Sequence, residues 1–281
     1  MIYEIPPQSS NCLKSLAAQI QIDGVGHMQT LELTAKKYGY PGWKKAQQEL
    51  PVTPFKITLE ASYETEEGKK GKVALTLPFK KSVQELFYES TTHHALNWFD
   101  YIKKRDVFKL VITTNSLKDA RDYVARAFRS LYFMQETGLV FSRINSSKNV
   151  TAHQIPESCF HRKEEAPYFD HVSLWRNPSS AHLVVLNEPY TTLSVRTDGV
   201  FRNTPMGDEV DEWMARHGFV GGSIPHRGLY IVSPTSTFLM THKSSGYDYK
   251  KLIEAFNRVP ECLLASQWQY LEDNYMQKPL L

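Results

Sequence analysis

Apolar residues between positions 27 and 50 recur at intervals of three and four, a spacing that places them on one face of an α-helix. Glycine and proline at positions 39, 41 and 42 interrupt this repeat and favour a turn. The pattern predicts two short helices folded around a corner. Another helix, with Asn11 as its predicted N-cap, completes a three-helix N-terminal unit. The apolar positions of the helix pair are Met28, Leu31, Leu33, Ala35, Tyr38, Trp43, Ala46 and Leu50.

After Pro54 the pattern changes to alternating apolar and polar residues, the two-residue period of a half-buried strand. It predicts a hairpin over residues 55–78, with EEGKKGK as its turn. An aromatic-rich helix is expected over 82–102 and a strand over 107–112. A long helix is predicted from a cap at Ser116 to a stop at Gly138.

The second half of the chain mixes strands and helices without strict alternation. We therefore predict an α+β fold with a mainly antiparallel sheet. The expected domains are a helical unit over 1–50, an α+β domain over 51–145 and a second α+β lobe over 146–281. The expected elements of that lobe are a hairpin over 171–186, a helix over 208–218, strands at 229–232 and 238–241, and helices at 247–258 and 261–275.

Composition supports an ordinary folded protein. The 281 residues are 41% hydrophobic and 22% charged, which argues against wholesale disorder. Three widely spaced cysteines do not form a disulfide framework and favour a reducing compartment, so we predict a cytoplasmic protein. The sequence contains neither a secretion signal nor an apolar run long enough for a membrane span, and no membrane partner is expected.

The predicted helix pair is basic, because Lys36, Lys37, Lys44 and Lys45 lie at its polar positions. The spacing from Ala35 to Gly39 fits a helix-turn-helix, in which a small residue lets two helices approach and glycine adopts the left-handed corner. The four lysines are the predicted nucleic-acid contacts. A plain helical packing or partner-docking module is the alternative interpretation.

Charge is also uneven along the chain. Residues 1–150 hold 21 Lys and Arg against 15 Asp and Glu, whereas the remaining residues hold 12 against 15. Basic pairs at Lys69–Lys70 and Lys80–Lys81 attract a polyanion only if folding brings them to one face. Otherwise they are solvated loop charges that maintain solubility.

Several signatures of enzymes and cofactor sites are absent. The sequence lacks the phosphate-binding GxxxxGK[ST] motif, the dinucleotide motif GxGxxG, and the hydrolase motifs HExxH and GxSxG. His153, Glu157, Cys159 and His161 lie close together, and His171 follows, but their spacing does not match a structural zinc site. We therefore predict neither a metal nor another cofactor.

The densest polar and aromatic cluster is DHVSLWRNP at 170–178, with NEPY at 187–190 across the predicted turn. Antiparallel pairing brings the two ends of such a hairpin together, which suits proton transfer between a histidine and carboxylates. The same residues also suit a structural role at strand ends, with Trp175 in the core. The candidate catalytic residues are Asp170, His171, Arg176, Glu188 and Tyr190.

A glycine-rich segment, GGSIPHRGLY at 221–230, follows the predicted helix over 208–218. Glycine amides form concave anion sites, and an arginine beside them adds donors. The segment equally describes an ordinary connection from a helix to a strand.

The run LKSLAAQIQIDGVGHMQTLELTAKKYGYPGWKKA resembles the opening of a bacterial family described only as a domain of unknown function. This run is also similar to the short helical segment of glyoxalase-related proteins. The resemblance continues through LYFMQETGL, DHVSLWRNP, NEPY, WMARHGF and GLYIVS. The resemblance implies that the chain is related to these proteins, but it does not imply a reaction. Glyoxalase activity is not inferred, since the metal-ligand pattern of glyoxalases has no counterpart in this sequence. Members of such families often accompany mobile elements, which implies a nucleic-acid or defence-related role.

We therefore predict a non-enzymatic protein that binds a macromolecule, with DNA or RNA as the most specific partner. Two alternatives remain open. The first is an enzyme that uses the cluster at 170–190 on a small or nucleotide-derived substrate. The second is a protein–protein interaction or inhibitor protein that acts through its aromatic-rich helices.

Overall fold

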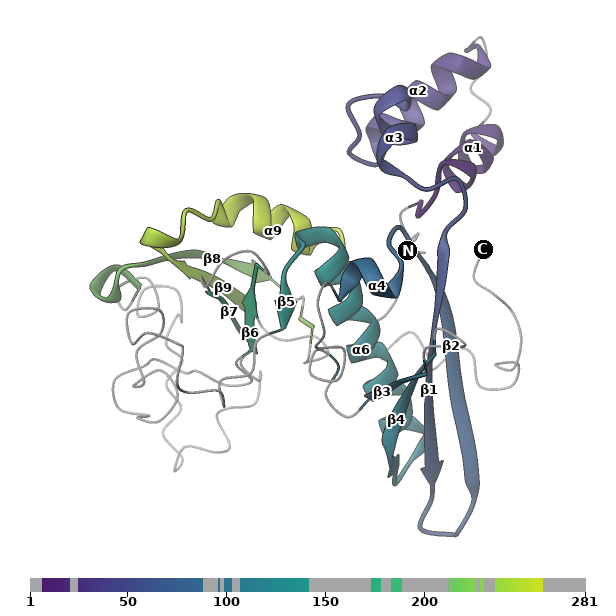
Figure 1. Ribbon diagram of the computed structural model, residues 1–281, viewed down its shortest axis with the longest axis vertical. Helices are drawn as coiled ribbons and strands as arrows, with labels where there is room; N and C mark the ends of the chain where they lie inside the picture. Colours follow the sequence, from purple (N-terminus) through teal and green to yellow (C-terminus); the bar gives the residue numbers. More distant parts are fainter. Residues whose placement is uncertain are drawn as a thin grey trace. The chain divides into compact units, whose positions relative to one another are not determined.

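The chain folds into helices and two separate β-sheets, so the predicted α+β class is confirmed (Figure 1). It divides into two compact units, and one of the boundaries between them lies after Val124, inside a long helix. None of the helices that the structure describes combines the length and apolarity needed to cross a lipid bilayer. This computed structural model describes residues 7–20, 25–87, 96, 99–102, 107–141, 173–177, 183–188, 212, 214–225, 228–229 and 236–259.

The predicted three-helix unit is present at the N-terminal end of the first compact unit. Its N-cap is Ser9 rather than Asn11, because the Ser9 hydroxyl accepts a hydrogen bond from the backbone N–H of Cys12 at 3.1 Å. The Ser10 N–H donates to the Pro51 carbonyl at 2.9 Å, which ties the exit of the unit to its entrance. The three helices are α1 (Ser10–Gln19), α2 (His27–Lys37) and α3 (Trp43–Glu49).

The hairpin predicted over 55–78 is confirmed as β1 (Phe55–Glu64) and β2 (Lys70–Phe79). Gly68 has φ +78 in its turn, a left-handed conformation that glycine adopts without steric cost. Opposite Gly71 lies Tyr63, whose ring covers the glycine so closely that a Cβ there would collide with it. The hairpin is therefore closed by a cross-strand aromatic–glycine pair.

The prediction of a single helix over 82–102 is wrong at its C-terminal end. A short helix, α4 (Val83–Leu86), begins at a Ser82 capping box, and residues 88–95 lie outside the described part of the chain. The end of the predicted segment is the strand β3 (Phe99–Ile102). Pairing decides this conformation, since Tyr101 lies opposite Phe108 and the two rings stack at 4.8 Å.

The strand predicted over 107–112 is confirmed as β4 (Val107–Thr114). It pairs antiparallel with β3 and parallel with β1, giving a mixed sheet in the order β2-β1-β4-β3. The long helix is also confirmed as α6 (Leu117–Thr137). The Ser116 hydroxyl accepts from the Asp119 N–H at 3.0 Å, and Gly138 follows the helix with φ +71.

The second unit contains an antiparallel sheet in the order β5-β6-β7-β9-β8. It confirms the predicted hairpin between residues 171 and 186. Trp175 is buried in its core, where Phe133 of α6 packs edge-on against it at 4.8 Å. The strands are β5 (Val140–Phe141), β6 (Ser173–Arg176), β7 (Leu183–Asn187), β8 (Phe219–Pro225) and β9 (Ser236–His242).

Helix α9 (Tyr249–Asn257) confirms the prediction over 247–258, and Asp248 caps it by accepting from the Lys250 and Lys251 N–H groups. The 3₁₀ turn η3 (Lys243–Ser245) precedes it. Residues 214–217 are helical and are followed by Gly218 with φ +76, as the predicted helix end required. The helix predicted over 261–275 lies outside the described residues.

Strand β8 replaces the expected glycine-rich loop at residues 221 and 222. Gly221 pairs with Met240 and Gly222 with Leu239, so both glycines belong to a ladder rather than an anion-binding nest. A Cβ at Gly222 would lie 2.7 Å from Cδ1 of Ile253, which explains why α9 packs here over glycine. Of the strand predicted at 229–232, Leu229 lies in a bend and the other residues lie outside the described part.

Candidate functional site

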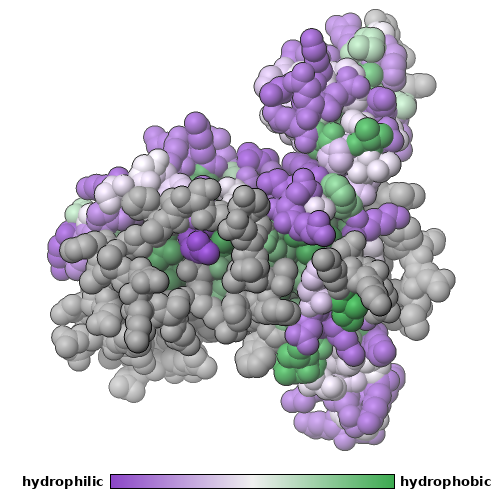
Figure 2. All heavy atoms as spheres, viewed as in Figure 1, coloured by the Kyte–Doolittle hydropathy of each residue, from purple (hydrophilic) through white to green (hydrophobic). Residues whose placement is uncertain are grey.

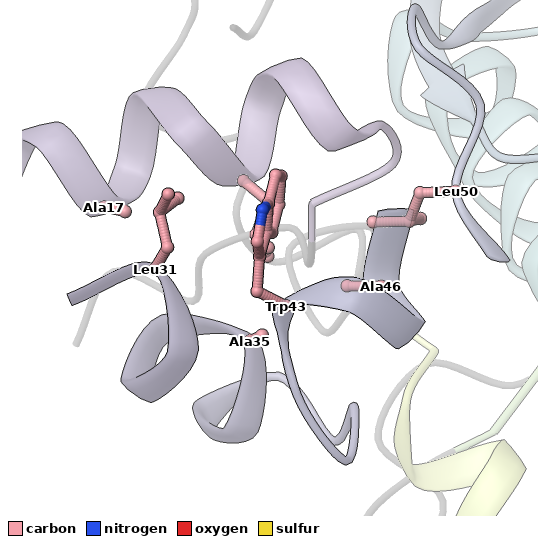
Figure 3. Packing of buried hydrophobic residues seen from close by; sticks show 7 residues of the cluster. Ala17, Leu31, Ala35, Trp43, Ala46 and Leu50 are labelled. Carbon is pink, nitrogen blue, oxygen red and sulfur yellow. The ribbon is translucent and has the colours of Figure 1, made fainter. Parts of the chain in front are cut away.

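The three N-terminal helices enclose a small hydrophobic core of their own (Figure 3). Trp43 is the largest side chain in this core and points from the start of α3 toward α1, with 7% of its surface exposed. Burying an indole of this size stabilises a small helical unit substantially. The buried members of this cluster are Leu13, Ala17, Leu31, Ala35, Trp43, Ala46 and Leu50.

The corner between α2 and α3 has the hydrogen bonds of a Schellman motif. The Gly39 N–H donates to the Lys36 carbonyl at 3.0 Å, and the Tyr40 N–H donates to the Ala35 carbonyl at 3.1 Å. Gly39 has φ +84, the left-handed conformation that the motif requires. Since Ala35 is also fully buried, the small residue and the glycine that suggested a helix-turn-helix have the predicted local roles.

The carboxylate of Glu32, on α2, holds the start of α3 in place. Oε2 of Glu32 accepts a hydrogen bond from the backbone N–H of Trp43 at 2.8 Å, so α2 supplies the cap that α3 lacks. Gly42 makes this contact possible, because a Cβ at that position would collide with Oε1 of Glu32. This polar contact, and the missing side chain at Gly42 that makes room for it, therefore add to the core packing that places α3 against α2.

The four predicted lysines are all exposed, but they have different surroundings. Nζ of Lys36 lies 3.7 Å from Glu32, and Nζ of Lys45 lies 3.4 Å from Glu49, each pair one helical turn apart. The Lys37 ammonium lies over the Tyr38 ring, 5.5 Å from its centroid.

Among the four lysines, only Lys44 makes neither an ion pair nor an aromatic contact with a residue that the structure describes. Exposed ion pairs of the Lys36 and Lys45 kind are weak and exchange readily with water and salt. The helix pair therefore retains its positive charge at the surface, and Lys44 carries the least compensated part of it.

One side of α3 projects away from the hydrophobic core. At 100° per residue, Gln48 lies within about 15° of the direction opposite Trp43, Ala46 and Leu50, and Lys44 and Lys45 lie about 50° to either side of it. All three are exposed. We call Lys44, Lys45 and Gln48 the α3 outward face. Gln48 was not singled out by the sequence, although its three-residue and four-residue offsets from the lysines are visible there.

Two apolar positions of α2 do not join the core. Met28 is 65% exposed and Leu33 is 45% exposed, whereas the neighbouring Thr30 and Thr34 are buried. The threonine hydroxyls donate to carbonyls four residues earlier, Thr34 to Thr30 at 2.7 Å, so their burial leaves no hydroxyl hydrogen unused. The surface of the helices remains largely hydrophilic in the view of Figure 2.

The structure describes two of the five candidate catalytic residues. Arg176 ends β6 opposite Leu183, at the turn end of the hairpin, whereas Glu188 follows β7 at the other end. About 13 Å of strand separates Leu183 from Asn187, so these two side chains start from opposite ends of the hairpin. Glu188 is fully buried and Arg176 is half-buried. Asp170, His171 and Tyr190 lie outside the described residues.

The candidate zinc ligands at 153, 157, 159, 161 and 171 also lie outside the described residues, and the described part of the chain has no cluster of metal-ligating side chains. A buried arginine is the polar feature that sequence reasoning missed in the second unit. Arg129 is 1% exposed, and its Nε donates to the Leu229 carbonyl at 3.0 Å. Its position among the apolar residues of α6 is visible in the sequence, but its partner, 100 residues away, is not.

Comparison with known proteins finds no match: no family model, no curated protein and no solved structure is significantly similar to this chain.

Proposed function

We propose that this chain is a non-enzymatic nucleic-acid-binding protein that contacts DNA or RNA through its N-terminal helical unit. The observation that carries the proposal is the α3 outward face, where Lys44, without an ion pair among the described residues, stands beside Lys45 and Gln48. Ammonium groups on such a face displace counterions from a phosphate backbone, which supplies most of the free energy of sequence-independent binding.

The packing of the unit supports this role. Trp43, the Glu32 cap and the Schellman corner hold α3 in one orientation, so its side chains are ordered before a ligand arrives. Preorganisation of this kind reduces the conformational entropy lost on binding. Lys36 and Lys37 add two exposed ammonium groups on α2.

The reducing compartment expected from the cysteines is consistent with a cytoplasmic location, and Cys12 is a free thiol. A role linked to mobile elements or defence is part of the proposal and is supported only by the resemblance of the sequence motifs to a bacterial family of unknown function.

The test is fluorescence anisotropy with labelled 20-nucleotide probes, as duplex DNA, single-stranded DNA and single-stranded RNA, between 50 and 200 mM salt. We expect at least one probe to bind, with an affinity that falls as salt rises. The double variant Lys44→Glu, Lys45→Glu should weaken that binding by more than tenfold, and Lys44→Gln should lower the salt slope by about one.

The matched control is Lys69→Glu with Lys70→Glu, in the β1–β2 turn, because it changes the net charge by the same amount on an exposed surface. Its binding should stay within about threefold of that of the unmodified protein if the effect is local. Absence of binding to every probe at 50 mM salt would remove the proposal, as would equal losses in the two double variants.

A further inference from the structure

Resting on the proposed function, we propose that the target is duplex DNA and that Gln48 reads adenine in its major groove. Gln48 lies at the centre of the α3 outward face, with a lysine on each side. A glutamine in this position offers one acceptor and two donors at the place where a docked helix meets base edges.

The chemistry of the glutamine side chain selects adenine. Its amide oxygen accepts from N6 of adenine while its amide nitrogen donates to N7, a two-bond pairing that no other base edge in the major groove offers. Gln48 is exposed and makes no hydrogen bond through its side chain with any residue that the structure describes. The Gln48 amide can therefore contact a base without first breaking a hydrogen bond within the described part of the protein.

The dimensions of α3 select duplex DNA over duplex RNA. A helix of about 10 Å diameter enters the B-form major groove, about 12 Å wide, but not the narrow major groove of A-form RNA. The seven residues of α3 extend roughly 10 Å, which covers about three base pairs. A single base-reading side chain, Gln48 in the last turn of α3, matches that length.

Lys44 and Lys45 serve as phosphate contacts in this arrangement. They diverge on either side of Gln48, as do the two phosphate backbones that border the groove. Lys45 exchanges its exposed partner Glu49, 3.4 Å away, for a phosphate. Glu32 keeps its place at the Trp43 N–H, so the first turn of α3 stays capped in the complex.

Gln47 provides a matched control on the same helix. It has the same side chain and is also exposed without a hydrogen bond to a described residue. However, the helical rotation places it more than about 100° from the centre of the outward face. Gln47→Ala and Gln48→Ala therefore remove the same side-chain amide from two different sides of α3.

The experiment measures the affinity of the full chain for two 20-base-pair duplexes, alternating A·T and alternating G·C, at 100 mM salt. We expect the unmodified protein to prefer the A·T duplex by about tenfold. Gln48→Ala should abolish that preference while it leaves binding to the G·C duplex within about twofold, and Gln47→Ala should retain the preference. Circular dichroism melting verifies that both variants are folded.

A third duplex, with 7-deazaadenine in place of adenine, lacks the N7 acceptor and leaves the rest of the groove almost unchanged. The unmodified protein should bind this duplex more weakly than the A·T duplex, because it loses the bond to N7 and keeps the one to N6, and Gln48→Ala should not distinguish the two. An unchanged preference in Gln48→Ala, or equal binding to an A·U RNA duplex, would overturn the adenine assignment while nucleic-acid binding survives. Failure to bind any nucleic acid would overturn the proposed function itself.

Discussion

Charged side chains are used differently in the N-terminal helical unit and in the second compact unit. In the helical unit they remain in water, and the ion pairs of Lys36 and Lys45 link neighbours on one helix. In the second unit Arg129 and Glu188 are almost completely buried. An exposed charge keeps its hydration and is available to a partner, whereas a buried charge has given up water for contacts within the protein.

This contrast explains why the exposed lysines, and not the buried charges, form the better candidate site. Changing an exposed lysine alters the surface potential with little effect on folding. Changing a buried arginine alters the fold, so loss of activity in such a variant says little about binding. Three sets of substitutions test the contrast, and the set at Arg129 should cost the most stability.

Arg129→Ala should lower the free energy of unfolding by about 3 kcal/mol, because it removes a buried side chain and leaves the Leu229 carbonyl without its donor. Urea denaturation followed by circular dichroism measures the loss. Arg129→Met keeps much of the volume, so its smaller loss, about 1–2 kcal/mol, measures the polar contacts of the guanidinium group together. A loss below about 1 kcal/mol for Arg129→Ala would contradict the contrast, because a buried charge would then contribute little more to stability than an exposed lysine of the helical unit.

Gly42→Ala should destabilise the helical unit by about 1–2 kcal/mol, because the new Cβ displaces Glu32 from the Trp43 N–H. Its φ of 176 is extended backbone that alanine also adopts, so the effect should come from Glu32 alone. In a Glu32→Ala background, Gly42→Ala should therefore cost almost nothing. Thermal unfolding of both single variants and the double variant measures this coupling, and additive losses would refute the explanation.

Lys36→Gln and Lys45→Gln should each lower stability by less than about 0.5 kcal/mol, since each breaks one exposed ion pair within a helix. The difference should fade as salt rises from 0.1 to 1 M, because screening weakens such pairs. Lys44→Gln, without an ion pair to a described residue, is the control and should show no salt-dependent loss. A larger loss for Lys44 than for Lys36 would reverse the assignment of paired and uncompensated lysines.

Elements with a strong local signal could be predicted from the sequence. The β1–β2 hairpin, helix α6 with its Ser116 cap and Gly138 end, and the left-handed corner at Gly39 depend on residues near one another in the chain. Their hydrophobic period, capping side chains and glycines are therefore readable without a tertiary structure.

Elements that depend on distant partners could not be predicted in this way. Residues 99–102 form β3 because β4 lies beside them, and their aromatic content suits a helix or a strand equally before that pairing is known. Strand β8 contains two glycines, which weaken a strand signal, and its ladder with β9 compensates for them.

For the candidate site, the amino-acid sequence is enough to predict a three-helix unit with four lysines on its polar side, because helical periodicity is a local property. The cap on α3 becomes apparent only when the helices are packed together, because Gly42 then makes room for the Glu32 carboxylate. Packing of Trp43 against the other helices turns Gln48 outward between Lys44 and Lys45. The direction of a side chain depends on what its helix packs against, and that is a contact between segments.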